Sequence, residues 1–205
     1  HTNLANCIYH DDYGAGKAMG QVVAGFSKKG IAYIGVTRDD KAAGAAREDG
    51  FIAGLKNAGI TLLEENKRTS AFTLESGYEA ALDLLESKCD IDVISCATDT
   101  IAAGAIEAIQ TYLKKQVPAN AADAGARMRY ILENTSIRVT GFGDNQMLKA
   151  VTGGIPTIHF GYKTSGIRGA ELLLDSIERG EQIPIEMKLG FRLVGADPSD
   201  SENQT

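Results

Sequence analysis

Residues 93–97 form a short apolar run that ends at Thr98-Asp99 and is followed by apolar side chains at helical spacing. The β-branched members of the run predict a strand buried on both faces, as in a parallel sheet. Thr98 and Asp99 can each begin the helix that carries Ile101 and Ile109. The unit therefore predicts a polar turn at the carboxyl edge of a sheet, where open α/β folds bind small molecules. Capping of the helix alone would also explain Asp99.

Strand and helix patterns alternate along most of the chain. Strands are expected at residues 6–9, 31–36, 60–63, 93–97, 137–142, 157–160 and 185–194. Helices are expected at residues 13–29, 42–58, 75–87, 99 to about 114 and 162–179, and one more helix should include Leu148 and Ala150. This order predicts an α/β fold with a mostly parallel sheet and helices on both faces. Residues 115–136 are less regular and could hold one short helix at 120–134, and the polar end of the chain is expected to be disordered.

Composition limits the classes of partner. The 205 residues suffice for one large domain or two small ones, and the net charge of −6 predicts no nucleic-acid-binding face on this chain. No apolar run could span a bilayer, so no membrane partner is expected. Cys7, Cys89 and Cys96 are an odd number of cysteines at wide spacing, which suits a reducing compartment and predicts a cytoplasmic protein. Because His1 is not an initiator methionine, the beginning of the natural protein is expected to be absent here.

Common enzyme signatures are missing from the sequence. It contains no phosphate-binding loop, no Gly-x-Ser-x-Gly elbow and no His-Glu-x-x-His motif. His159 is interpreted as a core or rim histidine rather than a general base. Gly14-Ala15-Gly16 lacks the spacing of a dinucleotide-binding fingerprint. We therefore expect no catalytic residues, no metal, no cofactor and no enzymatic activity.

Polar side chains and one aromatic ring at the expected carboxyl ends of strands predict a binding site for a polyol. The candidates are Arg47, Phe72, Thr98, Asp99 and Asp144. Guanidinium and carboxylate groups bind neighbouring hydroxyls, and an aromatic ring can cover the apolar face of a sugar. Each residue also has a simpler explanation. Arg47 could be solvated or paired with Glu48 or Asp39, Phe72 could belong to the core, and Asp144 could only cap a helix.

Five segments in the same order resemble the effector-binding core of the lac-repressor/gal-repressor family of bacterial transcription regulators. They are residues 46–55 (AREDGFIAGL), 76–78 (SGY), 96–105 (CATDTIAAGA), 139–142 (VTGF) and 156–158 (PTI). Each motif is weak alone, but the collinear series is specific and covers nearly the whole chain up to Val194. The Gly-Phe-Gly sequence at 141–143 resembles sucrose-operon repressors more than lactose or galactose repressors.

The resemblance implies a periplasmic-binding-protein-like fold of two Rossmann-like parallel-sheet subdomains joined by a hinge and crossovers. Residues 1–10 and 159–185 would then be parts of the N-terminal subdomain, 11–158 and 186–195 the C-terminal subdomain, and 196–205 a polar tail. The N-terminal subdomain would be incomplete in this chain. Family members begin with a helix-turn-helix headpiece, a hinge helix and most of the first subdomain, and all of these would precede His1.

Site residues follow from the resemblance position by position. Arg47 matches an arginine that binds sugar hydroxyls, and Phe72 matches an aromatic residue that stacks on the sugar. Thr98 stands where many members have a ligand-binding Asn, Asp99 matches the acidic residue beside it, and Tyr162 lies near a crossover position that lines the cleft. Two departures are Gly143, where many members have an Asp that binds sugar hydroxyls, and Gly195, where an Arg is common. Asp144 remains next to the first of them.

The implied function is that of a sugar-responsive repressor, a homodimer whose operator affinity changes when a sugar or sugar phosphate binds between the subdomains. Operator DNA would be bound through a headpiece that this chain lacks. A periplasmic sugar-binding protein of a transporter shares the fold and is the alternative, although the odd number of widely spaced cysteines favours the repressor. A sugar-processing α/β enzyme is a third possibility that the missing catalytic motifs disfavour.

Overall fold

The computed structural model describes residues 5–27, 29–87, 89–117, 123, 125–127, 129–130, 136–180 and 184–196. Its strands are β1 (Cys7–His10), β2 (Ile31–Gly35), β3 (Lys67–Thr69), β4 (Val93–Cys96), β5 (Arg138–Thr140), β6 (Thr157–Phe160), β7 (Glu186–Leu189) and β8 (Phe191–Val194). Its helices are α1 (Asp12–Phe26), α2 (Arg47–Asn57), α3 (Leu74–Glu86), α4 (Asp99–Gln116), α6 (Gln146–Thr152) and α7 (Tyr162–Arg179). A π-helix at Lys41–Ala46 leads into α2, and a 3₁₀ turn at Glu64–Asn66 precedes β3.

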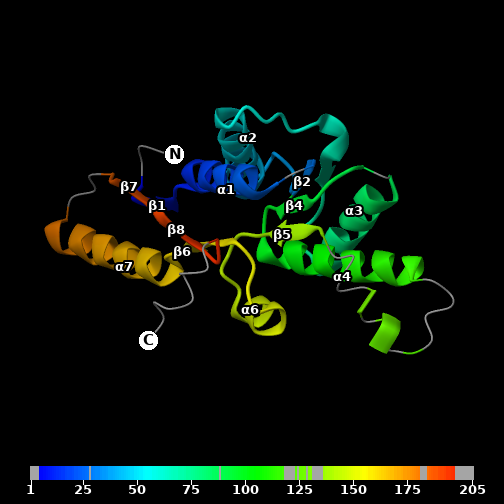
Figure 1. Cartoon of the computed structure of the whole chain (residues 1–205). Helices are drawn as coiled ribbons and strands as arrows, with labels where there is room; N and C mark the ends of the chain where they lie inside the picture. The colour runs from blue at the N-terminus through cyan, green and yellow to red at the C-terminus, as the bar shows by residue number, and fades with distance from the viewer. Residues whose placement is uncertain are drawn as a thin grey trace.

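The main sheet has four parallel strands in the order β3-β2-β4-β5. Helices α1 and α2 pack together on one side of it, and α3 and α4 pack together on the other (Figure 1). This arrangement confirms the predicted α/β fold with helices on both faces of a mostly parallel sheet. It also brings the ends of β2, β4 and β5 to one edge, and the helices α2, α4 and α6 follow those ends in sequence.

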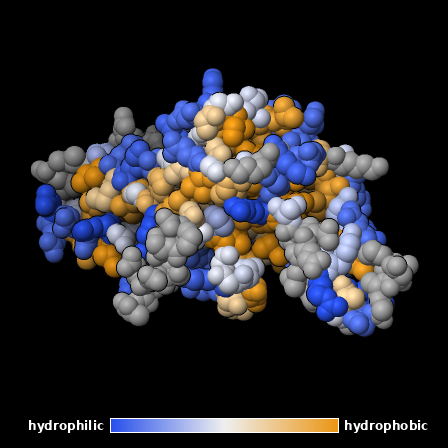
Figure 2. All heavy atoms as spheres, in the orientation of Figure 1, coloured by the Kyte–Doolittle hydropathy of each residue, from blue (hydrophilic) through white to orange (hydrophobic). Residues whose placement is uncertain are grey.

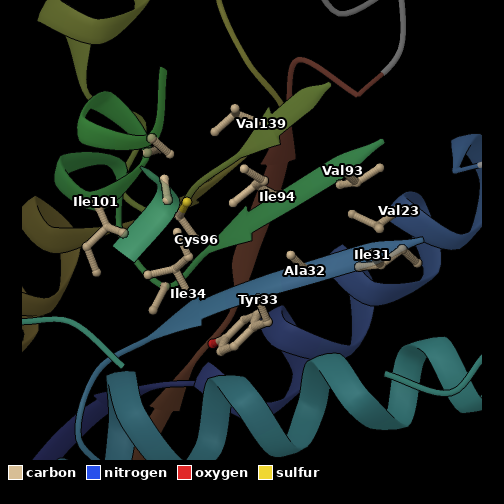
Figure 3. Close-up of a cluster of buried hydrophobic side chains, with 14 of the residues drawn as sticks. Val23, Ile31, Ala32, Tyr33, Ile34, Val93, Ile94, Cys96, Ile101 and Val139 are labelled. Atoms are coloured by element: carbon tan, nitrogen blue, oxygen red, sulfur yellow. The ribbon is translucent and has the colours of Figure 1, made fainter. Parts of the chain in front are cut away.

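The central strands β2 and β4 are buried along their whole length because both faces of the sheet are covered. All five residues of β2 are buried, and successive side chains point to opposite faces. The Tyr33 ring stacks on Phe51 of α2 with centroids 5.0 Å apart. Ile34 and Ile94 point to the other side of the sheet, where Ile101 of α4 lies (Figure 3). Together these layers form one continuous hydrophobic core.

Two small sheets lie beside the main one. β1 pairs in parallel with β7, and β6 pairs antiparallel with β8. The single strand expected at residues 185–194 is therefore wrong. The chain forms two strands that separate at Gly190 and join different sheets. The alternating pattern runs through both strands, so the pattern alone carries no sign of the change of partner.

The strand expected at residues 60–63 is also wrong. The Ile60 amide donates to the Leu55 carbonyl and so ends α2, and residues 61–63 belong to no element. The strand at this edge of the sheet is β3, which is polar rather than apolar. Lys67 of β3 forms an ion pair with the buried Glu48 at 2.6 Å, and Arg68 forms one with Asp83. The apolar criterion therefore missed β3, because its side chains bind charged helix residues.

The other expected elements agree with the structure within a few residues, and α7 has the predicted bounds, Tyr162–Arg179. The possible helix at 120–134 lies largely outside the described residues, and the expected disordered tail lies outside them. No helix among the described residues combines the length and the hydropathy that crossing a membrane requires.

Apolar side chains reach the surface on α6 and α7 (Figure 2). Met147 and Val151 of α6 are 76% and 77% exposed. Helix α7 has no buried residue, and its exposed large apolar side chains are Tyr162, Ile167, Leu173, Leu174 and Ile177. Helix α7 is amphipathic in sequence, yet within the described chain its main contact is with β1.

Candidate functional site

The guanidinium of Arg47 joins the starts of two helices to the end of a strand. Arg47 is the first residue of α2, and its Nε donates a hydrogen bond to Asp12 Oδ1 at 2.7 Å. Asp12 is the first residue of α1, and each side chain of this ion pair is 11% exposed. Nη1 of Arg47 donates to the backbone carbonyl of Ala97, directly after β4, at 2.8 Å. The partner of Arg47 is therefore Asp12, rather than Glu48 or Asp39.

A glycine on α1 sets how closely the two helices approach at Arg47. A Cβ atom on Gly16 would lie 2.2 Å from the Arg47 carbonyl oxygen and 3.0 Å from the backbone nitrogen of Phe51. Such distances are shorter than van der Waals contact, so α1 and α2 can cross at this spacing only where position 16 lacks a side chain. Gly16 therefore helps to place the first turn of α2, and with it Arg47, beside Asp12.

Two buried aromatic rings lie against the guanidinium of Arg47. Its Cζ is 5.1 Å from the ring centroid of Phe142 and 5.2 Å from that of Phe160. Both rings are within the range in which a cation is attracted to an aromatic face. The Phe160 ring also contacts the His10 ring, with centroids 4.9 Å apart, and the Tyr162 ring, at 6.0 Å. The aromatic cluster thus extends from the arginine to the start of α7.

Asp99 binds the turn that follows β5. Its Oδ2 accepts a hydrogen bond from the Asn145 amide at 2.6 Å, and its Oδ1 accepts one from the Thr157 hydroxyl at 2.8 Å. The Asp99 amide donates to the Phe142 carbonyl at 2.8 Å. The interpretation of Asp99 as only a helix cap is wrong, because Thr98 is the residue whose side chain caps α4. Asp99 instead ties α4 to the β5–α6 turn and to β6.

Burial raises the pKa of the Asp99 carboxyl above its usual range. The nearby charge of Asp144 raises it further, whereas hydrogen bonds from Asn145 and Thr157 and the charge of Arg47 act in the opposite direction. Asp99 is only 4% exposed, and both of its carboxyl oxygens accept hydrogen bonds within the protein. Its geometry therefore favours holding the turn over contacting a ligand directly.

Asp144 and His159 form a pair at the edge of the site. His159 Nδ1 lies 2.9 Å from Asp144 Oδ2, and the two side chains are 43% and 10% exposed. Asp144 has a positive φ of 51°, and Gly143 before it has a φ of 134°, where side chains are strongly disfavoured. The backbone conformation at position 143 therefore favours a glycine there. Asn145, not Asp144, caps α6, so the interpretation of Asp144 as a cap is wrong.

The structure brings most of the predicted site residues together. The charges of Arg47 and Asp144 both act on the Asp99 carboxyl, so the three side chains lie near one another. Thr98 is the residue before Asp99 and caps α4. Tyr162 joins through its ring contacts and is 57% exposed. Phe72 follows β3 along the same edge and is 50% exposed, so it is not a core residue. Within the described chain, no hydrogen bond or ring contact links it to Arg47.

Several residues of the site were not predicted from the sequence. They are His10, Asp12, Phe142 and Phe160, together with the pairing of His159 to Asp144. Asp12 carried a usable signal, because an acidic residue at the start of a helix after a strand lies at the same sheet edge as the other candidates. Phe142 and Phe160 are the last residues of the strands expected at 137–142 and 157–160, so they had the same positional signal, but they were counted only as strand residues.

The chemistry of this arrangement suits the binding of a polar ligand. Arg47 has N–H groups beyond those bound by Asp12 and Ala97, and the described residues provide no acceptor for them. Within the ranges that the structure describes, no three His, Cys, Asp or Glu side chains are grouped so as to hold a metal ion. Donors on Arg47, an acceptor on Asp144 and exposed rings at Tyr162 and Phe72 fit a ligand that carries several hydroxyls.

Comparison with known proteins gives a family match and sequence relatives. The profile of the "Periplasmic binding protein domain" family matches residues 5–152. The sucrose operon repressor of Staphylococcus xylosus is 29% identical over 189 residues, which is 91% of this chain and 52% of that protein. The chain therefore spans about half the length of this relative.

Solved structures show the same fold. The complex named "transcriptional regulator CelR-cellobiose complex" covers 94% of this chain at a TM-score of 0.75 and 21% identity, and this chain covers 53% of it. A LacI family transcriptional regulator from Enterococcus faecium with bound ribose covers 94% at a TM-score of 0.73 and 18% identity, with 65% of that chain covered. At these identities the likeness establishes the fold alone.

Proposed function

Because this chain belongs to the periplasmic binding protein domain family, we propose that it is the effector-binding part of a sugar-responsive bacterial transcription repressor. The sequence relative described above, one of several, is an operon repressor, which agrees with the resemblance to lac-repressor/gal-repressor regulators and to sucrose-operon repressors in particular. The same match supports a regulator over the binding protein of a transporter. A cytoplasmic location, a homodimer and binding of operator DNA by another part of the protein belong to this proposal.

The observation that carries the proposal is the position of Arg47. Its guanidinium is fixed by Asp12 and the Ala97 carbonyl at the carboxyl edge of β4, with further N–H groups unused by the described residues. A rigid donor fork at this edge recognises paired hydroxyls with little loss of side-chain entropy. Asp144 and the exposed ring of Tyr162 supply the acceptor and the apolar face that a sugar also needs.

The mechanism would be a change in the relative position of two subdomains. We propose one subdomain of residues 1–10 and 161–189 and another of residues 11–160 and 190–195. This adjusts the division expected from the sequence so that β1 stays with β7 and β6 stays with β8. The three connections between the proposed subdomains would lie near His10, Phe160 and Gly190, where β1 leads into α1, β6 into α7 and β7 into β8. Sugar binding beside these crossings would favour one orientation, and a coupling of about 1–3 kcal/mol is typical of such switches. The exposed apolar residues of α7 support a packing partner outside the described residues.

A thermal-shift screen of the full-length protein tests the proposal. The panel should contain sucrose, fructose, trehalose, cellobiose, ribose and their phosphates, because a ligand that binds only the folded state raises the unfolding midpoint. We expect one sugar or sugar phosphate to raise the midpoint and to change the affinity for DNA upstream of the protein's own operon. A folded protein that responds to no sugar in the panel would contradict a sugar effector, and an unchanged DNA affinity would contradict a repressor.

A further inference from the structure

His10 has a polar atom that the protein itself leaves without a partner. Its Nε2 is buried, and no described residue forms a hydrogen bond to it. A buried imidazole nitrogen without a hydrogen bond destabilises the folded protein, so such an atom needs a reason to persist. A ligand group that forms the missing bond is one such reason.

His10 lies within the site described above. It is the last residue of β1, and its ring is 4.9 Å from the Phe160 ring and 5.3 Å from the Tyr162 ring. Phe160 is also the ring against which Arg47 lies, with Cζ 5.2 Å from the centroid. Asp12, the ion-pair partner of Arg47, follows His10 by two residues. His10 and Arg47 thus contact the same aromatic ring from the same end of the strands.

Packing holds the His10 ring firmly. The contact with Tyr162 is edge-on, at 78° between ring planes, and that with Phe160 is tilted at 43°. Its Cα partner in the parallel sheet is Leu189, and the next amide, that of Asp11, donates to the Leu189 carbonyl at 2.9 Å. The ring itself is therefore fixed, but its Nε2 is inaccessible to solvent, so a ligand group can reach this atom only when a covering side chain moves. Tyr162 lies edge-on to the ring and is 57% exposed, so it is the side chain that can turn away.

We propose that His10 Nε2 hydrogen-bonds a hydroxyl of the bound sugar, so that His10 is a specificity-determining residue of the site. This inference rests on the proposed sugar-binding function. A hydroxyl suits this atom because it can donate or accept, and so can bind an imidazole nitrogen in either tautomer. His10 would read a hydroxyl next to the aromatic wall of Phe160 and Tyr162, while Arg47 reads others.

Three substitutions at this position separate the atom from the ring. His10→Phe keeps an aromatic ring of similar size but removes both nitrogens. His10→Gln can place an amide near Nε2, whereas the shorter side chain in His10→Asn reaches only the position of Nδ1. Full-length wild type and variants are titrated calorimetrically with sucrose, fructose, cellobiose and ribose, and their unfolding midpoints are measured with and without each sugar.

We expect His10→Phe to weaken binding of the sugar that wild type binds by about tenfold, the cost of one hydrogen bond. The midpoint of the sugar-free variant should stay the same or rise, because an unsatisfied buried polar atom has been removed. His10→Gln should recover part of the affinity and His10→Asn should not. One monodeoxy derivative of that sugar should bind wild type more weakly than the parent sugar does. His10→Phe should bind this derivative and the parent sugar with equal affinity.

Other results would overturn the inference in distinguishable ways. If wild type binds a sugar and His10→Phe binds it equally well, only the role of His10 fails. If His10→Phe lowers the midpoint of the free protein and leaves the sugar affinity unchanged, another part of the protein binds Nε2. If wild type binds none of the four sugars, the inference fails together with the sugar-binding function on which it rests.

Discussion

Arg47 and Asp12 are separated by 35 positions in the sequence, yet Arg47 Nε donates to Asp12 Oδ1 at 2.7 Å. Each is the first residue of its helix, and the pair is largely shielded from water. The contact fixes the guanidinium at the edge of the sheet, and the close crossing of α1 and α2 at Gly16 makes it possible. The geometry of the site thus depends on how two neighbouring helices pack.

Arg47→Ala should abolish sugar binding and the response of the full-length protein to sugar. It should also destabilise the fold by about 3–5 kcal/mol, because Asp12 is left as an uncompensated, mostly buried charge. The double variant Arg47→Ala/Asp12→Ala removes both charges and should recover part of the stability but none of the binding. Titration calorimetry and denaturant unfolding measure the two effects. Sugar affinity that is unchanged in Arg47→Ala would show that Arg47 has no part in the site.

Phe72→Ala should reduce the free energy of sugar binding by about 1–3 kcal/mol through lost stacking. Since Phe72 is 50% exposed, the free energy of unfolding should change by less than about 0.5 kcal/mol. Leu63→Ala is the matched control, because Leu63 is also 50% exposed but was not predicted to contact the ligand. Equal sugar affinity of Phe72→Ala and Leu63→Ala in calorimetry would rule out a stacking role.

The features that were predicted correctly from the sequence are those set by residues close to one another in the chain. Helix α7 was predicted with its bounds, because its apolar periodicity and its terminal Gly180 lie within one segment. The polar strand β3 and the separation of β7 from β8 at Gly190 were missed, because both depend on partners distant in the chain. Likewise, sequence predicted Arg47 as a site residue but not its partner Asp12, whose position depends on helix crossing.

Asp99 should make the stability of the protein depend on pH in a defined direction. Its carboxyl has a raised pKa in the folded chain, so the folded state favours the protonated form more than the unfolded state does. The contribution is therefore fully present below the usual aspartate pKa of about 3.9, and it is lost as the pH rises through the raised pKa of Asp99. Asp99→Asn lacks this titration, so its stability relative to wild type should increase over that window and be constant above it.

Asp99→Ala separates the charge of this residue from its hydrogen bonds. It leaves the Asn145 amide and the Thr157 hydroxyl without their acceptor, at a cost of about 1–3 kcal/mol for each group. Asp99→Asn should cost less, because its amide oxygen can accept from Asn145 while the Thr157 hydroxyl turns to accept from its NH₂. Urea unfolding from pH 4 to pH 8 measures all three proteins. A pH-independent difference between wild type and Asp99→Asn would contradict the raised pKa.

Gly16→Ala should destabilise the fold and weaken sugar binding together. The added methyl would lie 2.2 Å from the Arg47 carbonyl oxygen, a backbone atom that cannot rotate away, so α1 and α2 must separate. Overpacking of this kind costs about 1–3 kcal/mol, and the shift would move Arg47 relative to the sheet edge. Gly25→Ala makes the same change in the same helix with no atom within 4 Å, and should stabilise by about 0.4–1 kcal/mol. If both variants change the free energy of unfolding equally, helix propensity rather than the crossing at Arg47 determines the effect.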